Sequence, residues 1–219
     1  MNNNPSRFPA FSATLVGILS LGYAIFFLFI SKRAPFIGGL GSWLILAASG
    51  FFSSAAYVAL YTRLKEHDET MALWAMVLGV GASFATILHG GYQALLLVRP
   101  GLSAGPVIDA LPSQADPGGL ETFFLVGLVS LIFSSLILRS GIFSRNLAIL
   151  GMVNGCVLII LYLATISAAQ TLILISGGLT SVILGPIWWI WIGSSLREKS
   201  TVRAMQSSPA SQSTSRGMQ

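Results

Sequence analysis

Residues 71–98 read MALWAMVLGVGASFATILHGGYQALLLV, and this stretch of 28 residues contains no Lys, Arg, Asp or Glu. A bilayer core of about 30 Å is crossed by about 20 helical residues that rise about 1.5 Å each. The stretch is therefore long and apolar enough to form a transmembrane helix. Five further stretches have no charged residue in their middle, at residues 10–30, 37–61, 120–138, 146–168 and 171–196. We expect an all-α protein, a polytopic membrane helical bundle of six transmembrane helices.

The composition favours the same class. Hydrophobic residues make up 54% of the 219 residues and charged residues 9%, whereas soluble domains contain about 25% charged residues. The mean hydropathy of +0.79 would leave a soluble protein with a large exposed apolar surface. The six spans and their loops use nearly the whole chain. We therefore expect one six-helix domain over residues 1–199 and a disordered cytoplasmic tail over residues 200–219.

The basic residues predict the orientation of the bundle. With six spans, both termini and the second and fourth loops share one side of the membrane. That side holds nine Lys or Arg residues, and the other side holds only Lys32, Arg33 and Arg99. Because basic residues resist translocation, we expect both termini to be cytoplasmic and the protein to be a multi-pass protein of the cell inner (cytoplasmic) membrane.

The net charge of +5 does not indicate a nucleic-acid partner. The basic residues lie at the ends of spans and in the tail, where anionic headgroups attract them, and not in a patch with aromatic residues. The expected partner is the lipid bilayer, with other membrane proteins or a small apolar ligand as alternatives.

Two residue types are interpreted by their position in the spans. Trp188, Trp189 and Trp191 lie just before the basic residues that follow the sixth span. Indole rings prefer the headgroup level, so we expect an interfacial belt; the alternative is a site for a sugar or a cofactor ring.

Cys156 is the single cysteine, which excludes an intramolecular disulfide, and we expect it to be a small buried hydrophobic residue.

Small residues spaced four apart predict close helix crossings in four spans. They are Gly50 and Ser54 in the second span, Gly81 and Ala85 in the third, Gly151 and Gly155 in the fifth, and Gly177, Ser181 and Gly185 in the sixth. Pro186 follows in the sixth span and should kink it. Asp116 should cap the start of the fourth span.

Polar side chains inside a membrane are costly and mark candidate sites. His89 lies about four residues outward of the middle of the third span, or about 6 Å by helical rise, and Gln93 lies one turn further on the same face. Residues that should reach a similar depth or the outer rim complete the candidate set: Tyr92, Tyr23, Tyr162 and Glu121. We expect these six residues to line an outward-facing ligand pocket. The alternative is that His89 and Gln93 only form hydrogen bonds between helices.

Several membrane chemistries lack their residues in this sequence. Haem b bridging two helices usually needs paired axial ligands, and only one histidine lies in a span. A retinal-type Schiff base needs a lysine inside a span, and a membrane metalloprotease needs an HExxH-like pair; neither occurs. We therefore expect no cofactor, no metal site and no catalytic residue. His67 lies among acidic residues in the second loop, which we interpret as a solvated turn; the alternative is weak binding of a divalent cation.

Three segments carry a resemblance to a known family. They are residues 59–64 (ALYTRL), 116–120 (DPGGL) and 184–191 (LGPIWWIW). They resemble segments of multi-span bacterial integral membrane proteins that are grouped as a domain-of-unknown-function family. The resemblance implies a bacterial inner-membrane helical bundle, and it carries over no catalytic residues.

Three classes of function remain. The first is a non-enzymatic accessory or partner-interacting membrane protein, which is the class we expect. The second is a small-molecule or lipid binder or transporter with an outward-facing polar pocket around His89. The third is a membrane enzyme that acts on a lipid or a quinone. A cavity that touches His89 would favour the second class, and a sealed bundle with a flat apolar face would favour the first.

Overall fold

The computed structural model describes residues 7–99, 116 and 119–206, and within these ranges it contains helices and no strand. Six helices are long and apolar enough to cross a membrane, at Phe8–Arg33, Pro35–Leu64, Glu69–Val98, Leu120–Ser140, Arg145–Ile166 and Gln170–Arg197. They agree with the six predicted stretches to within a few residues. The all-α, six-helix prediction is confirmed, and helices of this length and composition are typical of a multi-pass membrane protein.

Three of the six spans contain a π-helical turn. The elements in chain order are α1 (Phe8–Ile25), η1 (Phe26–Ile30), α2 (Ser31–Arg33), α3 (Pro35–Leu64), α4 (Glu69–Val98), η3 (Leu120–Leu125), α6 (Val126–Ser140), α7 (Arg145–Ile166), α8 (Gln170–Gly178), η4 (Leu179–Leu184) and α9 (Gly185–Gln206). The π turns lie inside the first and sixth spans and at the start of the fourth, whereas α3, α4 and α7 are single helices.

Capping side chains mark where several helices begin. Asp68 accepts a hydrogen bond from the Met71 backbone N–H at 3.0 Å at the start of α4, and Ser144 caps α7 in the same way. The Asp116 carboxylate accepts bonds from the backbone N–H groups of Glu121 (3.0 Å) and Thr122 (2.7 Å). Asp116 therefore caps the fourth span as expected, although the first helical residue is Leu120.

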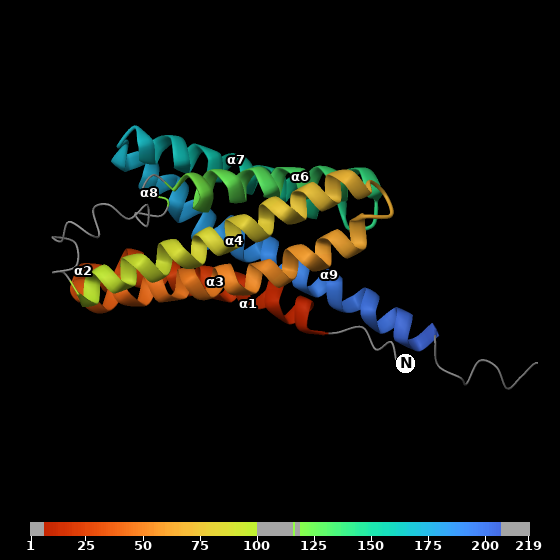
Figure 1. Cartoon of the computed structure of the whole chain (residues 1–219), viewed down its shortest axis with the longest axis horizontal. Coiled ribbons are helices and arrows are strands. Elements are labelled where there is room, and N and C mark those ends of the chain that lie inside the picture. The colour runs from red at the N-terminus through yellow and green to blue at the C-terminus, as the bar shows by residue number, and fades with distance from the viewer. Residues whose placement is uncertain (1–6, 100–115, 117–118, 207–219) are drawn as a thin grey trace, which may run out of the picture.

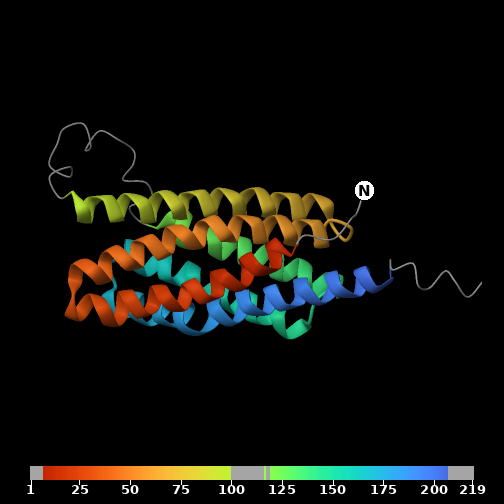
Figure 2. The same cartoon turned by 90° about the horizontal axis from the view of Figure 1, so that it is seen from below.

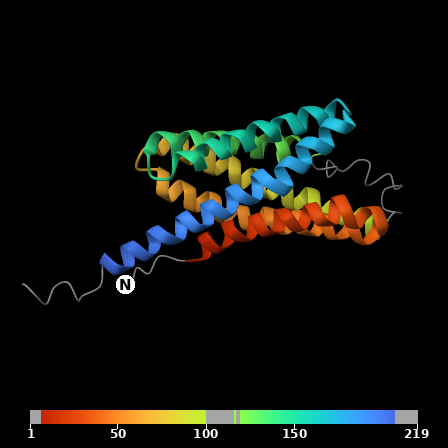
Figure 3. The same cartoon turned by 180° about the vertical axis from the view of Figure 1, so that it is seen from behind.

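The spans form a closed ring in chain order (Figures 1 and 2). Each span packs against the one before it and the one after it, and the ring closes because α9 packs along α1 (Figure 3). The start of α1 and the end of α9 lie at the same end of the bundle, together with the loops at residues 65–68 and 141–144 (Figure 1). We call the half of the bundle at this end the terminal half, and the other half the hollow half.

Glycines allow three helix pairs to approach closely. A Cβ added at Gly50 of α3 would lie 2.6 Å from the Ser83 carbonyl oxygen of α4. Gly127 of α6 and Gly155 of α7 each face the other's carbonyl oxygen, at 2.8 and 2.7 Å from an added Cβ. A Cβ at Gly17 of α1 would lie 2.9 Å from the carbonyl oxygen of Pro186 in α9. Because lipid tails are as apolar as the helices, this close packing holds the bundle together.

The predicted small-residue stripes were only partly right. Gly50 and Gly155 lie at crossings, but a Cβ at Gly81 would meet no described atom within 4 Å. A Cβ at Gly177 would make only an ordinary contact with the Leu161 side chain at 3.8 Å. A four-residue spacing defines a helix face, but it does not say which neighbour that face meets.

The terminal half contains a packed aromatic core. The Tyr57 ring stacks on Phe133 at 5.8 Å between centroids and meets the edge of Trp189 at 5.4 Å. Trp188 and Trp189 are in edge contact at 4.7 Å, and all four side chains are buried. The prediction of an interfacial belt is therefore wrong for Trp188 and Trp189, because the inner face of α9 carries them into the ring.

Two further expectations differ from the structure. Cys156 is exposed on α7 and not buried, because the neighbouring Gly155 occupies the face that packs against α6. The last helix continues to Gln206, so residues 200–206 of the expected disordered tail are helical; this segment contains no Pro or Gly to end a helix. Residues 207–219 of that tail lie outside the described residues.

Candidate ligand cavity

A cavity of about 420 Å³ lies in the centre of the ring, mainly in the hollow half. All six spans contribute to its wall, and Tyr57 and Trp189 of the aromatic core form part of that wall. Sites for small molecules in proteins have volumes of roughly 300–1,000 Å³. The cavity is therefore large enough for a small organic molecule.

Helical spacing explains how each span presents residues to the cavity. On α7 the lining residues are Asn154, Leu158, Leu161 and Thr165, which follow one another at intervals of three or four and so share one face. On α4 the lining residues Thr86, His89 and Gln93 follow the same rule. The wall is mostly apolar, with hydroxyl, imidazole and amide groups at intervals.

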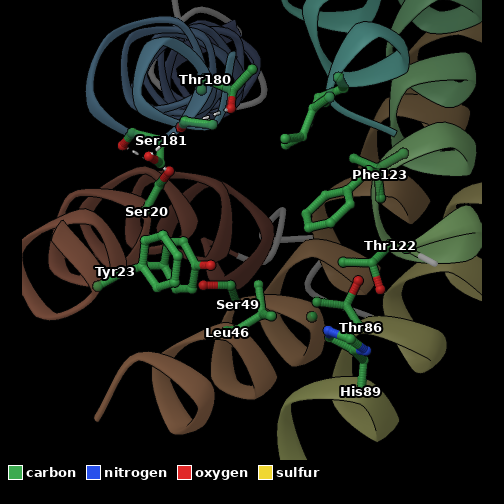
Figure 4. Close-up of a pocket in the computed structure, with 18 of the residues that line it drawn as sticks. Ser20, Tyr23, Leu46, Ser49, Thr86, His89, Thr122, Phe123, Thr180 and Ser181 are labelled. Carbon is green, nitrogen blue, oxygen red and sulfur yellow. Dashed lines mark hydrogen bonds between the residues drawn. The ribbon is translucent and has the colours of Figure 1, made fainter. Parts of the chain in front are cut away.

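Three of the six sequence-predicted site residues line the cavity: His89, Gln93 and Tyr23. The buried His89 ring meets the edge of Trp43 at 5.4 Å between centroids, and Tyr23 stacks on Phe27 at 5.5 Å. Figure 4 shows the side chains of Tyr23 and His89 directed into the cavity from two different helices, α1 and α4.

The other three predicted site residues, Tyr92, Tyr162 and Glu121, lie outside the lining. At about 100° per residue, Tyr92 is rotated by about 100° from Gln93. Tyr162 is rotated by the same angle from Leu161, and its ring packs on Phe124 at 5.5 Å. Glu121 is exposed beside the lining residue Thr122. Similar depth in the membrane was therefore not sufficient to place a residue in the cavity.

Most hydroxyl groups in the wall donate to a carbonyl oxygen of the protein. Thr86 donates to Ala82 at 2.8 Å and Thr180 to Ser176 at 2.9 Å, each one turn earlier in its own helix. Ser20 of α1 donates to the Ser181 carbonyl of η4 at 3.2 Å, which joins the first and sixth spans (Figure 4). These bonds offset much of the cost of burying hydroxyl groups in an apolar helical bundle.

Two side-chain oxygens in the wall have no hydrogen-bond partner among the described residues: Thr122 Oγ1 and Asn154 Oδ1. Thr122 is 4% exposed and Asn154 is 3% exposed. Thr122 lies in the first turn of its helix, so no helical carbonyl lies one turn before it. The Asn154 oxygen can only accept a hydrogen bond. The sequence prediction missed both residues, although an amide inside a span is itself a signal.

All three π turns border the cavity. The turn η1 contributes Phe27, η3 contributes Thr122 and Phe123, and η4 contributes Thr180 and Ser181. The turn η4 ends just before Gly185 and Pro186. Proline has no N–H for a helical bond and clashes with the preceding turn, and the helix widens there. Single π turns are frequent at functional sites in helical proteins.

The described residues contain no group of three or more His, Cys, Asp or Glu placed to bind a metal ion. Comparison with family models, with curated proteins and with solved structures gives no match to this chain. The fold and the cavity therefore define the class: a ring of six apolar helices around a largely apolar cavity.

Proposed function

We propose that this protein binds a small, mostly apolar molecule in the cavity of its hollow half. The observation that carries this proposal is the cavity of about 420 Å³, which is mostly apolar and has a few polar groups that face inward, as ligand sites do. Because the cavity touches His89, the binder class is favoured over the accessory role.

We also propose the location of the site. The nine-to-three distribution of basic residues supports cytoplasmic termini in an inner membrane. The terminal half would then face the cytoplasm, and the cavity would lie in the outer part of the membrane. The packed rings of Tyr57, Phe133 and Trp189 fill the path from the cavity toward the cytoplasmic end. This arrangement supports binding rather than passage across the membrane.

A matched pair of glycine substitutions tests the proposal. Gly178 lines the cavity, and a Cβ added there would meet no described atom within 4 Å. Gly178→Leu should therefore fill part of the cavity without displacing the backbone. Gly81→Leu adds the same side chain to an exposed face of α4, where an added Cβ also meets no described atom. It controls for the change in helix propensity.

The measurement uses the whole protein in phosphatidylcholine nanodiscs with 1-bromooctane, whose bromine quenches tryptophan fluorescence. Trp43 and Trp189 line the cavity and report on its occupant. We expect a saturable component of quenching in the parent protein and in Gly81→Leu, and its loss in Gly178→Leu. Equal saturable quenching in both variants, or none in the parent protein, would contradict ligand binding in this cavity.

A further inference from the structure

We infer that the ligand of this cavity is an uncharged amphiphile with two oxygen-containing groups, one of them a hydroxyl that donates to Asn154 and the other bound at Thr122. This inference rests on the proposed function and specifies the class of ligand.

The charge of the ligand follows from the wall. No Lys, Arg, Asp or Glu occurs among the lining residues in the described ranges. The nearest carboxylates lie outside the lining: Asp116 accepts two backbone N–H groups at the start of η3, and Glu121 is exposed. A charged ligand would lose its hydration without gaining a counter-ion, which is costly in a low-dielectric interior.

The hydroxyl group follows from Asn154. Its Oδ1 atom is buried, has no partner in the described part of the chain, and can only accept a hydrogen bond. A ligand that reaches it must therefore carry a donor. A hydroxyl is the simplest uncharged donor on an apolar molecule. Leu158 and Leu161, which follow Asn154 on the same face of α7, provide apolar contacts for the rest of the molecule.

Thr122 supplies the second polar position. Gly127 of α6 packs on Gly155 of α7, and the two helices run in opposite directions. Thr122 therefore lies about six residues, or about 9 Å by helical rise, from Asn154 along the bundle. One small polar group cannot reach both side chains. The two unpartnered oxygens therefore fit a molecule with polar groups near its two ends.

The test measures competition with 1-bromooctane by four probes of equal chain length: 1-octanol, 1,8-octanediol, octanoate and octyltrimethylammonium. Asn154→Leu removes the amide oxygen together with its NH2 group, Thr122→Val removes the hydroxyl, and both nearly keep the side-chain shape. Ser134→Ala is the matched control, because Ser134 Oγ is also buried and unpartnered among the described residues but does not line the cavity.

We expect Asn154→Leu to weaken competition by both alcohols about three- to tenfold, the effect of one neutral hydrogen bond. Thr122→Val should weaken only the diol, by a similar factor, and Ser134→Ala should change neither. Octanoate and octyltrimethylammonium should not compete measurably. All three variants should melt at or above the temperature of the parent protein, because each removes an unpaired buried group.

Two results would overturn the inference while the proposed function stands. In the first, 1-bromooctane quenching is saturable, but octanoate or octyltrimethylammonium competes with it as strongly as 1-octanol does. The second is a raised melting temperature in Asn154→Leu with no change in competition by either alcohol, which would mean that the amide oxygen binds only water. Loss of saturable quenching from the parent protein would instead overturn the proposed function itself.

Discussion

The terminal and hollow halves are built from the same six helices, yet they direct different side chains inward. In the terminal half the inner faces carry large rings such as Tyr57, Phe133 and Trp188, which are almost fully buried. In the hollow half the inner faces carry Thr86, Thr180 and other small polar residues around a cavity. Packing contacts, and not the hydrophobic effect, hold helices together in lipid. We therefore expect the terminal half to supply most of the stability, because the hollow half has fewer packing contacts around its cavity.

The largest expected effect compares one phenylalanine from each half. Phe133 is fully buried and stacks on Tyr57, so Phe133→Ala should lower the free energy of unfolding by about 3–5 kcal/mol. Phe123 is half-buried and points into the cavity (Figure 4), so Phe123→Ala should cost less than about half of that. Thermal unfolding in detergent, with tryptophan fluorescence as the signal, measures both. Equal losses would mean that the two halves are packed equally well.

A smaller effect concerns the close crossings. A Cβ at Gly127 would lie 2.8 Å from the carbonyl oxygen of Gly155, so Gly127→Leu must push α6 and α7 apart. We expect a loss of about 1–3 kcal/mol, typical of overpacking. The control Gly81→Leu, on an exposed face, should be neutral or slightly stabilising. The same thermal unfolding measurement compares the two variants. If Gly127→Leu is as stable as the control, α6 and α7 do not pack closely at Gly127.

The smallest effect concerns two turns with a left-handed backbone. Gly141, in the turn of the terminal half, has φ +62°, and Ala168, in the turn between α7 and α8, has φ +53°. An alanine is strained there, whereas glycine is not. Ala168→Gly should gain a few tenths of a kcal/mol, since relief of strain exceeds the added chain entropy. Gly141→Ala should lose about 1 kcal/mol. If Ala168→Gly instead lowers the stability, the backbone of Ala168 is not strained in the turn between α7 and α8.

The spans were predictable because their signal is the local absence of charge over a fixed length. The cavity was predictable where two polar residues repeat on one helix face, as His89 and Gln93 do. Tyr92 and Tyr162 were assigned by depth alone, and the rotation of their helices directs them away from the cavity. Trp188 and Trp189 were assigned by their nearness to basic residues, but the contact between α9 and α1 decides their burial.

Thr122 and Asn154 illustrate what a sequence pattern leaves open. The unpartnered hydroxyl of Thr122 depends on where η3 begins, and a helix start is uncertain by one or two residues from sequence. Asn154 lies between Gly151 and Gly155, the small residues for which a helix crossing was predicted. In the structure Gly155 faces α6, and Asn154 lies one residue round the helix toward the cavity.

The contact between α1 and α9 has a consequence for biogenesis. A ribosome makes the first span first and the sixth span last, so the two surfaces that close the ring meet only at the end of synthesis. Until then the wall that the sixth span contributes to the cavity is missing. Contacts between distant parts of a chain form slowly, which makes the five-span intermediate the stage most exposed to quality-control proteases. A chain cut before Gln170 would keep the crossings of α3 with α4 and of α6 with α7, but it would lack the part of the cavity wall that the sixth span provides.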